Sequence, residues 1–485
     1  MQCDEDKPVC RRCARNGRTC YGHRQPFSVL HEENIYASRH QKRPQGPRVK
    51  GSSATSLLST PPSRDLISES VAYFIHCHLD PTTNTPLLVG IPAKIILSNW
   101  NSSPVLELAA SSIALLLFSR TKLYPPATRV AFASYQESLA TLRATLSVPG
   151  CIHIDACLLA VCLLARYEDA VFSFDQNKGI PLKESMQIQK HHIGAIALLE
   201  YWVKCLAGTS APTASITYAR RALRKAALFG LIDLPDWLRD GALFGEEGFM
   251  RDLDRILIRA IDVRSQLKLF AEGQAGWQLR GPETMSTLRA IQREIRAIDI
   301  ALSECKSLDA DTSRCIQHAL ADHRVYSKKH FFHSRVYSFS NYAEAARCAH
   351  CHGYQILVNH LHISTLRLLE TFSPFQPRHP LVECQHMIDY LTEELMLVIP
   401  FGLDRFKVSE DPGLFGDQII INSDDDRRPY LAELMAIPLL IASTSDSVRM
   451  EYADWFRSQL ADTGRLLGYG AVESATSSSW PIQKY

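Results

Sequence analysis

From about residue 65 onward, hydrophobic residues recur every three to four positions, which is the spacing that lines one face of an α-helix. Tyr135, Leu139 and Leu142 form one such stripe, which ends before Pro149. The alternation typical of strands is almost absent, so the pattern predicts an all-α fold. We expect helices near residues 104–120, 156–165, 185–204, 213–229, 249–270, 283–305, 340–371, 381–399, 429–443 and 447–467.

Three of these helices carry a more specific expectation. The stretch from Ala156 to Ala165 is apolar on all sides, and Asp155 is a suitable N-cap for it, so we place this helix at the centre of the bundle. His192 falls on the apolar stripe of the 185–204 helix, where we expect a histidine packed in the core rather than a metal ligand. Gly468 follows the last predicted helix and is placed to cap it.

The composition is that of a large folded chain. Its 485 residues are 46% hydrophobic, which provides enough apolar side chains for a sizeable core. The 14 cysteines are dispersed through a long sequence in which we recognise no cleavable leader, and this favours a reducing compartment over secretion. The longest apolar run, Ile113–Phe118 with its approach from Val105, is shorter than the roughly 20 residues of a membrane span, so we expect no membrane partner.

Positive charge is concentrated at the start of the chain. Residues 1–50 contain eleven Lys or Arg and five Asp or Glu, whereas the whole chain has a net charge of +2. Residues 23–64 are rich in Pro, Ser, Arg and Gln and too poor in hydrophobic residues to form a core, so we predict a disordered basic linker there. The linker separates a first segment, 1–22, from a helical domain, 65–470, which leaves 471–485 as a tail.

Four cysteines, Cys3, Cys10, Cys13 and Cys20, stand close together with spacings of x6, x2 and x6. A Cys-x2-Cys pair places two thiolates on one turn, and flanking cysteines can close a tetrahedral shell, as in structural zinc sites. The segment Cys-Asp-Glu-x-Lys-Pro-x-Cys-x2-Cys-x6-Cys-Tyr-Gly resembles the second half of the fungal Zn2Cys6 binuclear cluster. That family binds DNA through this module.

The resemblance implies which ligands these cysteines are. The family pattern is Cys-x2-Cys-x6-Cys-loop-Cys-x2-Cys-x6-Cys and holds two zinc ions. The Asp-Glu-Asp-Lys-Pro stretch at residues 4–8 matches the loop, and no cysteine follows Cys20 until Cys77. Cys3 to Cys20 therefore correspond to ligands three to six. Ligands one and two, and the basic helix that enters the major groove, are not in this sequence, so we expect at most one structural zinc ion.

Two explanations of the incomplete pattern stay open: a first exon missing from this version of the sequence, or a shortened regulator that the cell really makes. Between the cysteines lie Arg11, Arg12, Arg15 and Arg18, which we expect to contact DNA phosphates. Phosphate contacts position a protein but carry no base information. We therefore expect the chain as written to bind DNA weakly if at all.

The helical domain also resembles the large regulatory region that follows the cluster in many fungal zinc-cluster regulators. The pieces that carry this resemblance are the apolar helices near 104–118 and 155–168, the Lys190–Leu199 helix, Ile441-Ala-Ser and Trp455-Phe456. The resemblance implies a nuclear transcription regulator whose partners are DNA, a second copy of the chain or other regulators. The alternative is a helical interaction protein that binds no DNA and pairs with full-length regulators or senses a metabolite.

Two further patterns point to other chemistry. The Cys-x-x-Cys-His pattern at residues 348–352 matches the haem-attachment motif, but it falls inside a predicted helix, where ordinary packing also places both cysteines on one face. Three aspartates at residues 424–426 resemble the magnesium motif of terpene cyclases, but a solvated loop before the helix at Pro429 accounts for them more simply. We find no Walker loop, Gly-x-Ser-x-Gly or His-Glu-x-x-His, and predict no enzymatic activity.

Overall fold

The computed structural model describes residues 64–79, 92–100, 103–148, 153–172, 186–273, 282–307, 315–320, 326–372, 379–409, 419–423, 427–478 and 480. The chain divides into two units, Met1–Pro61 and Pro62–Tyr485, and every described residue lies in the second. The fold is therefore that of the second unit.

Fourteen α-helices and two short pairs of antiparallel strands make up most of the described residues, which confirms the predicted all-α class. The helices are α3 (Arg64–His78), α4 (Ala93–Asn99), α5 (Pro104–Thr121), α6 (Pro126–Leu146), α7 (Ile154–Val171), α8 (Met186–Cys205), α9 (Ala214–Leu228), α10 (Gly248–Gly273), α11 (Pro282–Ser307), α12 (Tyr342–Phe372), α13 (His379–Gly402), α14 (Pro429–Thr444), α15 (Met450–Leu467) and α16 (Gly470–Glu473). The paired strands are β1 (Ile316–Ala319) with β2 (Arg335–Ser338), and β3 (Phe406–Val408) with β4 (Ile419–Ile421).

Local sequence determines where several helices begin and end. The Ser103 hydroxyl accepts the backbone N–H of Val105 at 3.3 Å, and Pro104 occupies the first turn of α5, where its missing N–H is harmless. Gly468 ends α15 with a left-handed φ of 73°, and the N–H that follows it bonds back into the last turn at 2.9 Å. The predicted start of α5 and the predicted cap of α15 are confirmed.

The start of α7 differs from the prediction. The helix begins at Ile154, so Asp155 is its second residue rather than its N-cap. The Asp155 carboxylate instead accepts a hydrogen bond from the Thr213 hydroxyl, which in turn accepts the Ile216 N–H in the first turn of α9. A carboxylate in the first turn still faces the positive end of the helix dipole. Asp155 therefore ties the beginnings of α7 and α9 together.

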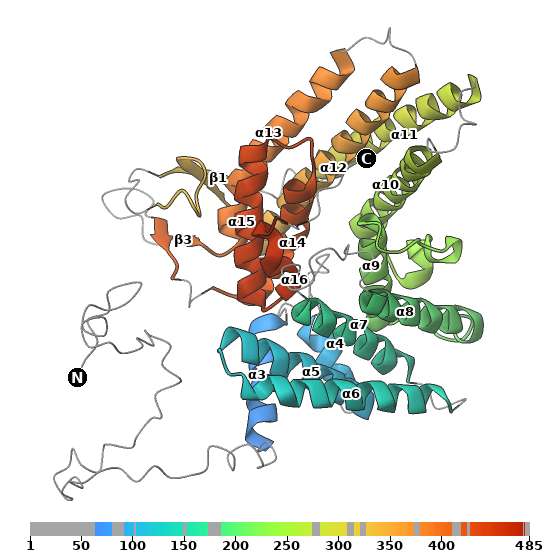
Figure 1. Ribbon diagram of the computed structural model, residues 1–485, viewed down its shortest axis with the longest axis vertical. Helices are drawn as coiled ribbons and strands as arrows, with labels where there is room; N and C mark the ends of the chain where they lie inside the picture. The colour runs from blue at the N-terminus through green and yellow to red at the C-terminus, as the bar shows by residue number, and fades with distance from the viewer. Residues whose placement is uncertain are drawn as a thin grey trace, which may run out of the picture. The chain divides into compact units, whose positions relative to one another are not determined.

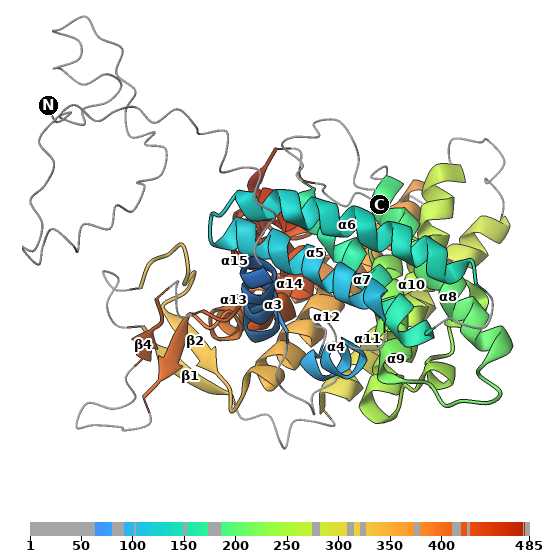
Figure 2. The same cartoon turned by 90° about the horizontal axis from the view of Figure 1, so that it is seen from below.

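The helices form a closed arrangement in which the last ones return to the first. α5 packs against α6 and α7, and from α7 to α13 each helix packs on the next. α14 then contacts α3 and α12, α15 contacts α5, and α16 contacts α7, so the C-terminal helices lie beside the N-terminal ones (Figure 1). Both strand pairs lie at the edge of the domain near α13, on the opposite side from α8 (Figure 2).

The helix α5 is apolar around its whole circumference. By length and composition alone its 18 residues could cross a membrane, contrary to the expectation from the sequence. In the fold, 67% of that stretch is buried, and α3, α6 and α7 pack around it. A helix enclosed by other helices needs no polar face, so burial in the core accounts for its composition.

The described residues beyond 470 pack onto the helical domain, although the sequence pattern left 471–485 as a tail. Ala471 and Ala475 are buried, and Trp480 keeps only 9% of its surface exposed. Gly464 shows how closely α16 approaches α15, because a Cβ there would lie 2.2 Å from the Glu473 backbone nitrogen. Residues 471–478 therefore belong to the helical domain.

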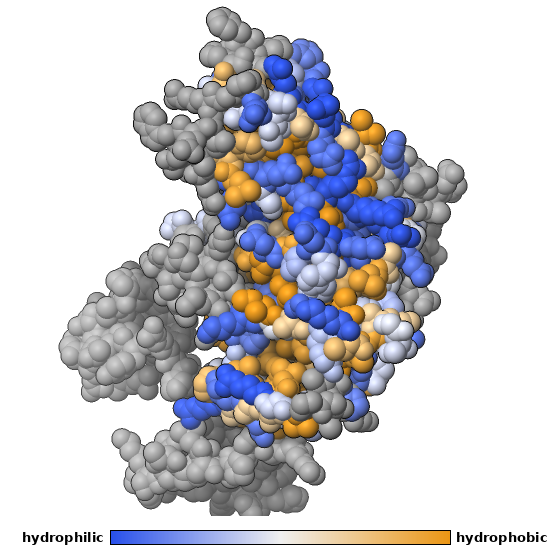
Figure 3. Space-filling view, turned by 90° about the vertical axis from the view of Figure 1, so that its right-hand side faces the viewer, coloured by the Kyte–Doolittle hydropathy of each residue, from blue (hydrophilic) through white to orange (hydrophobic). Residues whose placement is uncertain are grey.

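Large hydrophobic side chains also reach the surface of the domain. Ile193, Leu269 and Ile300 are each more than half exposed. On one face of the molecule the hydrophobic side chains form several patches separated by hydrophilic ones (Figure 3). Scattered exposure of this kind is ordinary for a folded domain and identifies no partner by itself.

A proline and a histidine meet where α12 crosses α14. Pro438 has no backbone N–H, so the Leu434 carbonyl one turn earlier lacks its normal helical donor. His350 of α12 replaces that donor, with its Nε2–H donating to the Leu434 oxygen at 2.8 Å. The other ring nitrogen then accepts from the Tyr354 hydroxyl at 3.2 Å. Gly353 permits this close crossing, because a Cβ there would lie 3.1 Å from the Pro438 Cα.

Replacing His350 with leucine should destabilise the fold by about 1–3 kcal/mol, because the Leu434 carbonyl is then buried without a donor. In a Pro438→Ala background the loss should be smaller, since alanine restores the backbone N–H that this carbonyl lacks. Urea denaturation of the parent, both single variants and the double variant measures the difference. Equal losses in the two backgrounds would contradict the compensating role of His350.

Candidate functional site

Three helices leave a cavity of about 120 Å³ between them. α8 and α9 both pack against α7, and all three present alanines to this space. Ala165 comes from α7 and Ala195 from α8, while α9 contributes Ala219, Ala222 and Ala226. Larger side chains would fill the space, because protein interiors are normally close-packed. The cavity is therefore a direct consequence of small residues at the helix contacts.

Titratable side chains line the same cavity at helical spacing. Cys162, Arg166 and Asp169 follow one face of α7, and Tyr218 and Lys225 follow one face of α9. The wall thus combines apolar stretches with a few charged or hydrogen-bonding groups. Sites for small molecules usually have this composition.

Arg166 is one charged group at the cavity that has a partner. Its guanidinium donates to both carboxylate oxygens of Glu433 on α14, and its Nη1 also lies 3.3 Å from the Tyr469 hydroxyl. Arg166 keeps 8% of its surface exposed and Glu433 keeps 5%. Burial opposes the charge, but the Glu433 carboxylate raises the pKa of Arg166 above its ordinary value. Arg166 therefore stays positively charged and joins α7 to α14.

Glu168 organises a second buried polar cluster beside the cavity. Its Oε1 accepts the Tyr135 hydroxyl at 2.5 Å and lies 3.0 Å from His191 Nε2. The Tyr135 ring stacks on Tyr167 with 4.4 Å between the ring centroids. Burial, and then the hydrogen bond to Glu168, raise the pKa of Tyr135, so its hydroxyl remains protonated and donates. The Glu168 carboxylate of α7 thus contacts one residue of α6, Tyr135, and one of α8, His191.

Lys225 and Asp169 differ from these groups, because neither makes a hydrogen bond or an ion pair with any described residue. Both line the cavity and are half-buried. Burial, followed by the charge of Arg166, lowers the pKa of Lys225. Burial raises the pKa of Asp169 from 3.8 to about 6, against the opposing charges of Lys225 and Arg166. A molecule bound in the cavity would supply the partners that these two side chains lack.

His192 lines the cavity, so it is a wall residue rather than the fully packed core histidine expected from its stripe. It is half-buried, and its Nδ1 has no hydrogen-bond partner among the described residues. Burial, and then the charges of Lys225 and His191, lower the pKa of His192 to about 4. The ring is therefore neutral near pH 7 and offers one donor and one acceptor.

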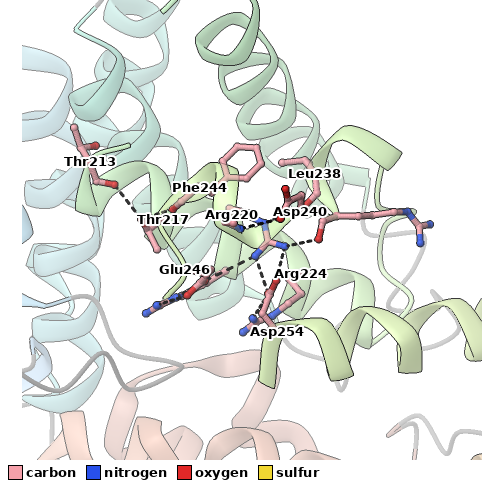
Figure 4. A network of polar contacts seen from close by, with 12 residues as sticks. Thr213, Thr217, Arg220, Arg224, Leu238, Asp240, Phe244, Glu246 and Asp254 are labelled. Atoms are coloured by element: carbon pink, nitrogen blue, oxygen red, sulfur yellow. Dashed lines mark hydrogen bonds and ion pairs between the residues drawn. The ribbon is translucent and has the colours of Figure 1, made fainter. Parts of the chain in front are cut away.

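A separate network of buried charges holds another face of α9 (Figure 4). The fully buried Arg220 donates from Nη1 and Nη2 to the two carboxylate oxygens of Asp254 on α10, at 2.7 and 2.8 Å. Arg224 donates to the same carboxylate. Burial opposes the charge of Asp254, but its bonds to Arg220 and Arg224 lower its pKa. Gly241 makes room for this carboxylate, because a Cβ there would lie 2.3 Å from an Asp254 oxygen.

The segment between α9 and α10 is fastened to the same network. Arg221 donates to both oxygens of Glu246, at 2.7 and 2.6 Å, and the Thr217 hydroxyl donates to the Phe244 carbonyl at 2.6 Å. These contacts hold α9 to the segment that follows it (Figure 4). Because Lys225 is on α9, they also fix one wall of the site.

The residues predicted from the sequence to bind metal or DNA lie outside the described residues. They are Cys3, Cys10, Cys13, Cys20, Arg11, Arg12, Arg15 and Arg18, and the aspartates at 424–426 lie outside as well. The Cys-x-x-Cys-His pattern lies in α12, where Cys351 and His352 are buried, as expected from ordinary packing. Within the described ranges, no group of three or more His, Cys, Asp and Glu side chains is arranged to hold a metal ion.

Hydrophobic patterning alone does not identify the cavity. The predicted apolar helix ends at Ala165, just before Arg166 and Asp169 continue the same face of α7. A usable signal is a charged residue on an apolar stripe, such as Lys225, which stands three residues after Ala222 on α9. Such a signal identifies single candidate residues. It does not show which helices face one another, and the site depends on that.

Replacing Asp169 with asparagine should stabilise the fold in a pH-dependent way. An acid whose pKa rises on folding binds more protons in the folded chain, so the free energy of unfolding falls as the pH rises from about 4 to about 6. The asparagine variant does not lose stability in this way. The difference in free energy of unfolding between the variant and the parent should therefore grow across that range and level off above about pH 7. Denaturation at a series of pH values measures it.

The exposed Asp252 on α10 offers a matched control for this measurement. Asp252→Asn should change the free energy of unfolding by less than about 0.5 kcal/mol at each pH. A difference between Asp169→Asn and the parent that is constant from pH 4 to pH 7 would show that Asp169 does not titrate in the cavity as described.

Comparison of the chain with protein-family models, with curated proteins and with solved structures finds no match.

Proposed function

We propose that the chain is a transcription regulator of the zinc-cluster type that acts in the nucleus, and that it is not an enzyme. One observation carries the proposal, namely the spacing of Cys3, Cys10, Cys13 and Cys20 around an Asp-Glu-x-Lys-Pro stretch. The all-α domain that follows supports it, since a large helical region accompanies the cluster in the family that the sequence resembles. In this proposal residues 1–22 bind zinc and the helical domain regulates.

Four thiolates at these spacings suit a structural zinc ion, and they hold at most one if they are ligands three to six of the family pattern. In the family that the sequence resembles, the complete module binds DNA, and its base-reading helix lies in the half that carries ligands one and two. Arginines among the cysteines supply phosphate contacts, which give affinity without sequence selectivity. DNA and a second copy of the chain, or another regulator, are the proposed partners.

A second candidate function is favoured by the cavity among α7, α8 and α9. A helical regulatory protein that binds no DNA could respond to a small molecule held there. Lys225 and Asp169 favour this reading, because a folded domain seldom keeps two charged side chains at a cavity without partners. The two functions are compatible, since a regulator can carry both a DNA-binding segment and a domain that binds a small molecule.

The purified 485-residue protein should contain no more than one zinc ion per chain. Cys10→Ser should release it, because three thiolates then remain of four. Cys315→Ser is the matched control, since Cys315 is an exposed cysteine of the helical domain, and it should leave the zinc content unchanged. Atomic absorption on protein prepared with zinc and reductant measures the metal. Two zinc ions per chain, or equal zinc in both variants, would contradict the assignment.

The same protein should bind duplex DNA weakly, without preference for sequence, and more weakly as salt is raised. Replacing Arg11, Arg12, Arg15 and Arg18 with alanine should flatten the slope of log affinity against log salt by up to about 3.6, or about 0.9 for each lost phosphate contact. Fluorescence anisotropy with labelled duplexes measures both quantities. Tight, sequence-selective binding by this chain would overturn the expectation that it lacks base readout.

A further inference from the structure

The charge balance of the cavity among α7, α8 and α9 indicates what kind of molecule it would hold. Arg166 is paired with Glu433, and His191 lies against Glu168. Lys225 and Asp169 are the charged residues that remain at the wall without a partner among the described residues. The open charges are therefore one positive and one negative, contributed by different helices.

The open charges do not neutralise each other directly. No ion pair joins Lys225 to Asp169, although each shifts the pKa of the other. A charged group removed from bulk water without a partner is costly, and the pKa shifts toward the neutral forms show that cost. A molecule that carries both complementary charges would offset both penalties at once.

The volume of the cavity indicates how large a molecule it could enclose. An apolar cavity of about 150 Å³ holds benzene, so a space of about 120 Å³ suits a ligand of roughly six non-hydrogen atoms. Part of the wall is apolar, with alanines of all three helices and Phe229 of the segment after α9. The space therefore admits a small ligand with one short apolar group.

We propose that this cavity binds a small zwitterion of the amino-acid class, with its carboxylate at Lys225 and its ammonium group at Asp169. The Tyr218 hydroxyl, which has no partner among the described residues, lies on the same face of α9 as Lys225 and donates to the carboxylate. The alanines receive the short side chain. This inference rests on the second proposed function only in treating the cavity as a binding site, and it requires neither zinc nor DNA.

Three probes of matched shape separate a zwitterion from a simple ion. L-alanine carries both charges, propionate lacks the ammonium group, and ethylamine lacks the carboxylate. In isothermal titration calorimetry of the full chain, alanine should bind, and each of the other two should bind at least about tenfold more weakly. Ligand-observed NMR extends the comparison to weak binding. Propionate that binds as well as alanine, or no binding by any probe, would overturn the proposal.

Variants of the two charged residues test the assigned roles. Asp169→Asn should weaken alanine binding at least about tenfold and leave propionate binding unchanged, because only alanine carries the group that Asp169 binds. Lys225→Met should weaken both acids, whereas Lys204→Met, at an exposed position of α8, should weaken neither. If the Asp169→Asn variant is folded by thermal denaturation, an equal loss of alanine and propionate binding would count against the proposal.

Filling the cavity gives a test that does not alter charge. Ala222→Leu places a larger side chain in the space and should abolish alanine binding, whereas Ala133→Leu, on the exposed face of α6, should preserve it. Thermal denaturation without ligand shows whether each variant is folded. Retained binding in a folded Ala222→Leu variant would place the ligand elsewhere and refute the proposal. Zinc content is measured separately, so a failure of either proposal is recognised independently of the other.

Discussion

The buried ion pair between Arg166 and Glu433 links an early helix of the helical domain to one of its last helices. It joins α7 to α14, and the Tyr469 hydroxyl extends it to the residue before α16. Such a pair adds little stability over apolar packing of equal volume, but loss of one partner alone leaves a buried charge at a cost of about 3–5 kcal/mol. Because Arg166 also lines the cavity, this ion pair between distant helices is part of the wall of the candidate site.

The helix α9 lies between two charge environments of opposite character. On one side Arg220 and Arg224 both contact Asp254, and Arg221 is paired with Glu246 of the following segment. On the cavity side Lys225 has no counterpart among the described residues. The paired side fastens α9 to α10 and to the segment between them. A rigid wall with an unmatched charge is what a preorganised binding site requires.

Two local requirements of the helices are met by side chains from other parts of the chain. The carbonyl that loses its donor to Pro438 accepts a hydrogen bond from His350, which burial keeps neutral by lowering its pKa to about 4. The beginnings of α7 and α9 are joined through Asp155 and Thr213. In both cases a backbone or helix-end requirement is met by a polar side chain of another element. A buried polar group such as His350 is part of the architecture and need not mark a site.

The sequence by itself determined the all-α class, the approximate extent of the helices and the cysteine pattern, because helical periodicity, capping residues and ligand spacing are local properties. It could not place Asp155, whose hydrogen-bond partner stands 58 residues away. Only the tertiary structure decided that alanines of three helices face one another, and that Asp169 and Lys225 share the space they leave. Such residues interact only after the core has packed, and packing depends on all the helix contacts together.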